Sequence, residues 1–86
     1  MSIDVLYFAS LREALGVSSE RLDSLPPGVT SAGQLRAWLR ERGAPWSEAL
    51  GEDRAVRIAV DRVMAGAATP IAENAEVAFF PPVTGG

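Results

Sequence analysis

The chain has 86 residues and a formal net charge of −3, and it contains no cysteine, histidine or lysine. This composition excludes a thiol nucleophile, a disulfide, a cysteine or histidine metal site and a lysine Schiff base, and it lacks the usual proton carrier near neutral pH. We therefore expect no enzyme that works by itself, and the acidic balance disfavours nucleic-acid and anionic-membrane partners.

No apolar run approaches the ~20 residues that span a bilayer. The first residues also lack the basic segment and long apolar stretch of a signal peptide. We therefore expect a cytoplasmic protein. The length fits one domain, which we expect over residues 1–80, followed by a tail over residues 81–86.

The first half of the chain predicts two strands with a short helical turn between them. Apolar residues at every second position predict a strand over residues 3–9. Ser10 and Glu13 have the spacing of a capping box, which predicts a helical turn over residues 10–15. Residues 17–25 are polar with spaced apolar positions, as in an edge strand.

The one long helix is expected over residues 31–42, because Ser31 and Gln34 repeat the capping-box spacing. Leu35 and Leu39 then share one helical face. A second short turn is expected over residues 45–50, where a proline stands at the start.

The last part of the chain predicts three strands. Apolar and other residues alternate over residues 55–60, which predicts a strand, and Asp61-Arg62 predicts a tight turn into a short strand at 63–65. A final strand over residues 76–80 ends at a pair of prolines. The whole order predicts an α+β fold with a mixed sheet of about five strands and one main helix on one face.

One amphipathic helix covers only one face of such a sheet. We expect that face to carry Ile3, Val5, Tyr7, Val56, Ile58, Val60, Val77 and Phe79. By parity the opposite face carries Leu6, Phe8, Ala59, Ala78 and Phe80. An uncovered apolar face usually marks a partner surface. The alternative is that residues 43–54 fold over it.

The end of the chain is the most informative segment. Phe79 and Phe80 run directly into Pro81-Pro82, and the sequence closes on Val83-Thr84-Gly85-Gly86. Adjacent prolines favour an extended chain, and six residues reach roughly 18–20 Å. Two residues without a Cβ can pass through a narrow channel and bring a bare carboxylate to reactive groups of another protein. A frayed terminus is the ordinary alternative.

With this ending, and with the Leu11-Arg12-Glu13 turn after the first strand, the sequence resembles the MoaD/ThiS family of sulfur carriers. It is most similar to the molybdopterin synthase small subunits, whose fold is the ubiquitin-like β-grasp. The resemblance covers essentially all of the chain. One departure is Asn74-Ala75, where the family commonly has Gly-Asp.

The resemblance implies that Gly86 is adenylated by a MoeB-type enzyme with ATP and magnesium and is then converted to a thiocarboxylate by a sulfur donor protein. The chain itself would bind no cofactor and no metal. Residues 81–86, namely Pro81, Pro82, Val83, Thr84, Gly85 and Gly86, would insert into the large subunit, in an assembly of two small and two large subunits. Sulfur would pass there to cyclic pyranopterin monophosphate. Phe8 and Phe80, with Leu6 and Ala59, would form the partner interface.

Two other functions remain open from the sequence. One is a related carrier that supplies sulfur to thiamine or to tRNA thiolation. The other is a ubiquitin-like protein modifier or a binding module.

Overall fold

Five strands form the sheet in the computed structural model, which describes residues 2–82. They are β1 (Ile3–Tyr7), β2 (Ser19–Leu22), β3 (Arg57–Val60), β4 (Val63–Ala65) and β5 (Glu76–Phe80). Their order across the sheet is β2-β1-β5-β3-β4. The central pair β1 and β5 is parallel and the other pairs are antiparallel, so the sheet is mixed as expected.

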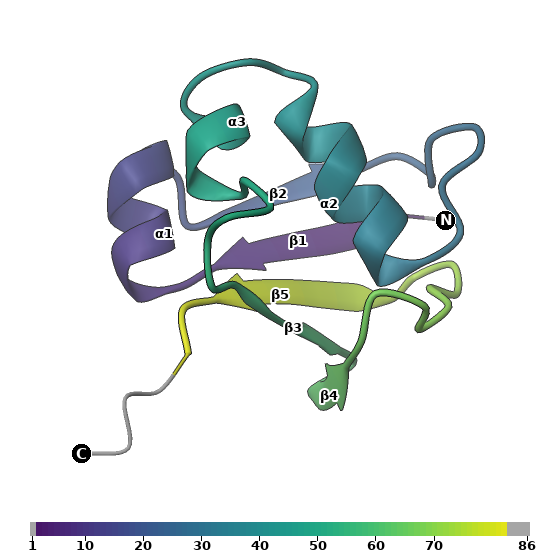
Figure 1. Ribbon diagram of the computed structural model, residues 1–86. Coiled ribbons are helices and arrows are strands. Elements are labelled where there is room, and N and C mark those ends of the chain that lie inside the picture. Colours follow the sequence, from purple (N-terminus) through teal and green to yellow (C-terminus); the bar gives the residue numbers. More distant parts are fainter. Residues whose placement is uncertain (1, 83–86) are drawn as a thin grey trace.

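Three helices lie on one side of this sheet (Figure 1). They are α1 (Ala9–Leu15), α2 (Ala32–Arg40) and α3 (Trp46–Ala49). Leu35 and Leu39 of α2 are fully buried and belong to the same core as Ile3, Val5 and Phe79 of the sheet. A mixed sheet in the order β2-β1-β5-β3-β4, with a parallel central pair and the main helix packed on one face, has the β-grasp arrangement, and this prediction is confirmed.

The segment 43–54 packs on the helix side of the sheet. Ala49 and Leu50 lie in the core that holds Leu35 and Leu39. The alternative that this segment covers the opposite face is therefore wrong. It fails because the apolar residues of α3 complete the core beside α2.

The start of α2 follows the predicted capping box. The Ser31 hydroxyl accepts a hydrogen bond from the Gln34 backbone N–H at 3.3 Å, and the Gln34 side chain accepts from the Ser31 N–H at 3.2 Å. The capping box at Ser10 is wrong. The helix already begins at Ala9, and its N-cap is Phe8, whose side chain makes no capping bond.

Several elements are shorter than expected, but every predicted helix and strand is present. The first strand ends at Tyr7, and the edge strand is confined to residues 19–22. Asp61 and Arg62 have φ values of 50° and 68°, as in the two central residues of a type I′ hairpin turn between β3 and β4. The predicted tight turn is confirmed.

Candidate functional site

The tail starts at the end of the sheet's central strand. β5 lies between β1 and β3, and it ends at Phe80. The backbone N–H of Phe8 donates to the Phe79 carbonyl at 3.1 Å, which places the two predicted interface phenylalanines, Phe8 and Phe80, near the same end. Pro81 and Pro82 follow, half-buried.

Val83, Thr84, Gly85 and Gly86 lie outside the described residues. The role assigned to Gly86 therefore stays a prediction, as does the insertion of the tail.

The face of the sheet opposite the helices carries an apolar row. Strand register aligns Leu6 with Ala78, Ala78 with Ala59, and Ala59 with Met64. Aligned partners point to the same face. Phe80 follows Ala78 on the same face of β5. We call Leu6, Phe8, Ala59, Met64 and Phe80 the outer patch.

The members of the outer patch differ in exposure. Phe8 is 48% exposed and Met64 is 58% exposed, whereas Leu6, Ala59 and Phe80 are partly buried. Ala78, expected on this uncovered face, is only 8% exposed, because its small side chain lies between Leu6 and Ala59 on the neighbouring strands. The alternation along β5 therefore predicted correctly which face Ala78 lies on, but the side chain is less exposed than expected.

Met64 is the residue that the sequence interpretation missed. It belongs to the outer patch because β4 pairs with β3 through the turn at Asp61-Arg62, which aligns Met64 with Ala59. The signal was present in the sequence, since that turn was predicted and a two-residue loop sets the register of a hairpin.

The other end of this face is charged. Arg21 Nε lies 2.9 Å from an Asp4 carboxylate oxygen, and Arg62 Nε lies 3.7 Å from one of Glu76. Asp4 is aligned with Glu76 and with Arg21 across three strands. The face thus changes from charged, at the start of β1 and β5, to apolar beside the root of the tail.

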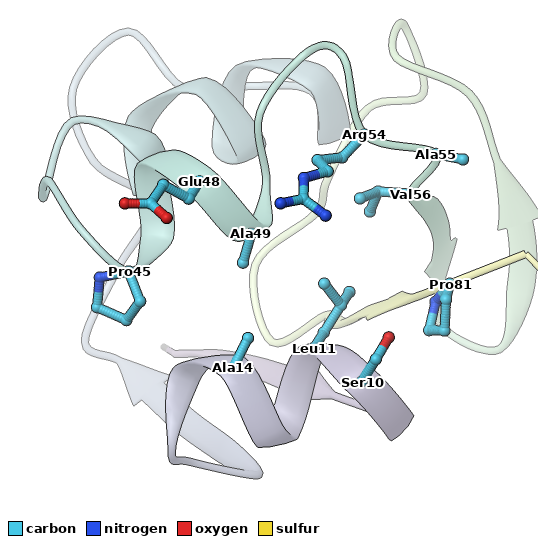
Figure 2. Close-up of a pocket in the computed structure, with 10 residues that line it drawn as sticks. All are labelled: Ser10, Leu11, Ala14, Pro45, Glu48, Ala49, Arg54, Ala55, Val56 and Pro81. Carbon is cyan, nitrogen blue, oxygen red and sulfur yellow. The ribbon is translucent and has the colours of Figure 1, made fainter.

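A groove of about 430 Å³ lies on the helix side of the tail root (Figure 2). Most of its lining residues are apolar or small, and α1, α3 and the segment before β3 supply them. They are Ser10, Leu11, Ala14, Pro45, Glu48, Ala49, Arg54, Ala55, Val56 and Pro81. The first residue of the tail thus forms part of the groove wall.

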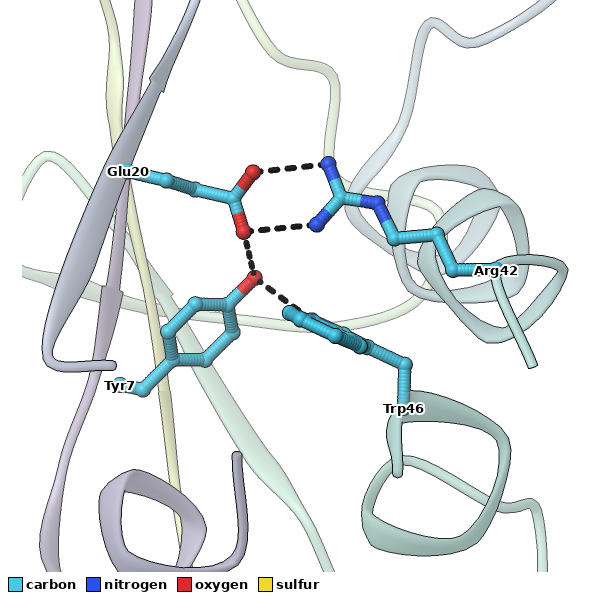
Figure 3. A network of polar contacts seen from close by, with 4 residues as sticks. All are labelled: Tyr7, Glu20, Arg42 and Trp46. Atoms are coloured by element: carbon cyan, nitrogen blue, oxygen red, sulfur yellow. Dashed lines mark hydrogen bonds and ion pairs between the residues drawn. The ribbon is translucent and has the colours of Figure 1, made fainter. Parts of the chain in front are cut away.

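A polar network ties β1 and β2 to the C-terminal end of α2 and to α3 (Figure 3). The Tyr7 hydroxyl donates to Glu20 Oε2 at 2.8 Å and accepts from Trp46 Nε1 at 3.3 Å. Arg42 donates two hydrogen bonds to the Glu20 carboxylate, at 2.8 and 2.7 Å. Its guanidinium carbon lies 5.1 Å from the Trp38 ring centre and 5.0 Å from that of Trp46.

Burial raises the pKa of the Tyr7 hydroxyl well above its usual value, and the Glu20 charge adds to this effect. Burial also raises the pKa of Glu20, but the hydrogen bonds from Arg42 and Tyr7 outweigh it, so that the pKa lies below its usual value. The network therefore keeps Tyr7 protonated and Glu20 ionised near neutral pH. We assign it a structural role, because each polar group in it is matched by another.

The described residues contain no set of side chains with evident catalytic chemistry. In residues 2–82 no three carboxylates approach one another closely enough to hold a metal ion. Nor does this part of the chain contain a helix long and apolar enough to cross a membrane. What these residues do provide is the outer patch, the groove and the start of the tail, which are surfaces that another protein can bind.

Comparison with known proteins gives a consistent result. The ThiS family model matches residues 5–86. Over 84 residues the chain is 38% identical to the molybdopterin synthase sulfur carrier subunit of Escherichia coli (strain K12) and 32% identical to that of Haemophilus influenzae. Each alignment covers 98% of this chain and 99% of the relative.

Solved structures share the fold over the whole chain. SAMP1 from Haloferax volcanii is 26% identical, with a TM-score of 0.72 and full coverage of both chains. A structure of the complex of subunits 1 and 2 of the molybdopterin-converting factor from Helicobacter pylori 26695 matches at 24% identity and a TM-score of 0.63, again with full coverage of both chains.

Proposed function

Because the chain belongs to the ThiS family, we propose that it is the sulfur carrier subunit of molybdopterin synthase. The observation that carries this proposal is the identity of 38% over 98% of the chain to a sulfur carrier subunit of that synthase. The position of the tail root supports it, since β5 delivers Pro81 beside an apolar face that no other part of residues 2–82 covers. The chain is not an enzyme by itself in this role.

The chemistry would take place on the Gly86 carboxylate. A carboxylate oxygen attacks the α-phosphate of ATP in a MoeB-type activating enzyme, with magnesium, and pyrophosphate leaves. A sulfur donor at the oxidation level of sulfide then displaces AMP, which yields the thiocarboxylate. No side chain of the carrier needs a tuned pKa in either step, which fits its lack of histidine and cysteine.

Sulfur would then pass from Gly86 to cyclic pyranopterin monophosphate in the large subunit, to form the molybdopterin dithiolene. The Helicobacter pylori structure is a complex of subunits 1 and 2 of the molybdopterin-converting factor. By analogy, the outer patch would dock on the large subunit and residues 81–86 would enter it. Two small and two large subunits would form the assembly.

Intact mass tests the proposal directly. The purified chain is incubated with the activating enzyme, ATP, magnesium and a sulfur donor. The protein mass should rise by the difference between a sulfur and an oxygen atom. A variant that lacks Gly86, and one with a residue added after it, should gain no sulfur while keeping the wild-type melting curve. An unchanged mass of the wild type, with an activating enzyme that modifies its own carrier, would contradict the proposal.

A second candidate is a protein modifier. The similarity to SAMP1 from Haloferax volcanii, a small archaeal modifier protein, favours it specifically. A modifier would form isopeptide-linked adducts through Gly86 in cells. A related carrier for thiamine or tRNA thiolation is distinguished by complementation of strains that lack each pathway.

A further inference from the structure

The groove beside the tail root has no part in the proposed chemistry. It lies on the helix side of the sheet, whereas the outer patch lies on the other side. Pro81 lines the groove and directly follows Phe80 of the outer patch. A protein that encloses the tail at its root is therefore in reach of both surfaces.

The groove is preformed by the fold. Leu11 and Ala49 belong to the buried core and form part of its lining. The wall before β3 is held by Arg36, whose guanidinium donates to the Leu50 carbonyl at 2.9 Å and to the Arg54 carbonyl at 3.1 Å, and also to that of Gly51. A binding site held in this way requires little reorganisation when it is occupied.

The charge in the groove indicates what it accepts. The Arg54 side chain points into the groove between the two helices and Val56 (Figure 2). It makes no ion pair within residues 2–82. The same holds for Arg12, Arg36 and Arg57, but among these four arginines only Arg54 lines the groove. The groove is also lined by Glu48, whose carboxylate likewise makes no ion pair within residues 2–82, so it holds one cation and one anion beside its apolar residues. Arg54 can therefore pair with a carboxylate of an incoming segment, while the apolar part of the lining accepts an apolar side chain and Glu48 faces a cation of that segment or water.

The size of an interface gives an independent argument. A stable protein interface typically involves roughly 20–30 residues on each side. The outer patch and the tail segment 81–86 together fall well short of this. The groove has ten lining residues, and because Pro81 already belongs to the tail segment, it adds nine.

We propose that this groove is a second docking site for the large subunit, and that it receives a segment of that subunit with an apolar side chain and a carboxylate that pairs with Arg54. The inference rests on the proposed function. The large subunit would then contact the root of the tail from both sides of the sheet, through the outer patch on one side and the groove on the other.

Two variants block the groove in different ways. Ala14→Arg fills it from an exposed position of α1, where arginine is nearly as good a helix former as alanine. Arg54→Glu reverses the charge of a side chain that makes no hydrogen bond within residues 2–82. The bond from Arg36 goes to the backbone carbonyl of this residue, which the substitution leaves in place. Ala68→Arg is the matched control, an exposed residue in the loop that packs against the start of α2.

The dissociation constant of each variant for the purified large subunit is measured by calorimetry, with melting curves recorded in parallel. Ala14→Arg and Arg54→Glu should each weaken binding at least tenfold, while Ala68→Arg should stay within twofold of the wild type. Dissociation constants for both groove variants within twofold of the wild type would overturn the inference. The inference would also be overturned if the groove variants bound the activating enzyme more weakly but the large subunit as well as the wild type does, because the occupant would then be a different protein.

The outcome separates the inference from the function on which it rests. Wild-type protein that binds the large subunit and acquires sulfur, together with unaffected groove variants, refutes only the docking site. Wild-type protein that neither binds nor acquires sulfur refutes both. If Ala14→Arg has a lower melting temperature than the wild type, the dissociation constant of Arg54→Glu alone tests the docking site.

Discussion

Removing the Tyr7 hydroxyl tests whether the polar network is a strong element of the fold. Tyr7→Phe keeps the ring, which is 1% exposed and stacks on Phe79 with 6.1 Å between ring centres. It deletes the hydrogen bond to the ionised Glu20 and leaves Trp46 Nε1 without its acceptor. A hydrogen bond to a charged group contributes about 1.5–3 kcal/mol. A loss of that size lowers the melting temperature of a domain of this length by roughly 6–24 °C.

The pH dependence makes the test specific. The pKa of Glu20 is lower in the folded protein, so its stabilising effect is present above its unfolded pKa of about 4.3 and is lost as the pH falls through the folded value. The pKa of Tyr7 is raised, so its effect is complete below about pH 10 and is lost as the pH rises further. The difference between wild type and Tyr7→Phe should therefore be largest between these limits.

The assay is urea unfolding of wild type, Tyr7→Phe, Glu20→Gln and the double variant at several pH values. The coupling free energy of this cycle should be favourable near neutral pH and should shrink under acid conditions. Two results would refute the reasoning. One is a stability of Tyr7→Phe equal to that of the wild type, and the other is a stability loss in Tyr7→Phe that does not change between acid and neutral pH.

Three further predictions follow from single positions. Gly33→Ala should destabilise the fold by about 1–3 kcal/mol in urea unfolding, because its Cβ would lie 2.8 Å from the Ala67 Cβ; Gly66→Ala, with nothing within 4 Å, is the control and should be near neutral. Arg62→Gly should stabilise the protein by about 0.5–1 kcal/mol, since φ is 68° at this residue and its side chain, which pairs with Glu76, is exposed; a lower urea midpoint would contradict this. Phe8→Asp should weaken binding of the large subunit by at least about 2 kcal/mol, as at an interface hot spot, without a change in melting temperature, and unaltered binding would remove Phe8 from the interface.

Local patterns in the sequence predicted the elements of the fold well. Alternation identified the strands because one face of each is buried, and Ser31 with Gln34 identified the start of α2 because both partners of the capping box are close in sequence. The same pattern failed at Ser10. The N–H of Phe8 still pairs with β5, and Ala9 with φ of 53° turns the chain into the helix at once, so Ser10 lies inside α1.

Features that depend on distant contacts could not be predicted. Glu20 and Arg42 are 22 positions apart, and Tyr7 and Trp46 are 39 apart, and no local pattern links them. The groove likewise needs α1, α3 and the tail root in place together. The outer patch was predictable, because parity and the strand order determine which side chains share a face. Met64 was missed although the predicted turn at Asp61-Arg62 sets its register. The tail residues 83–86 were identified from their chemistry alone, and their role stays a prediction.

The position of β5 has a consequence for how the protein is made. Of the five strands, the one that leads into the tail is the last to leave the ribosome, yet it is the middle strand of the sheet and pairs with β1, the first of the five. Such long-range pairing is slow, because the chain between the strands must lose entropy before the contacts form. Until β5 inserts, β1 and β3 cannot be bridged and the outer patch does not exist. Partners that recognise this patch would therefore distinguish finished carriers from nascent or unfolded chains with the same last six residues.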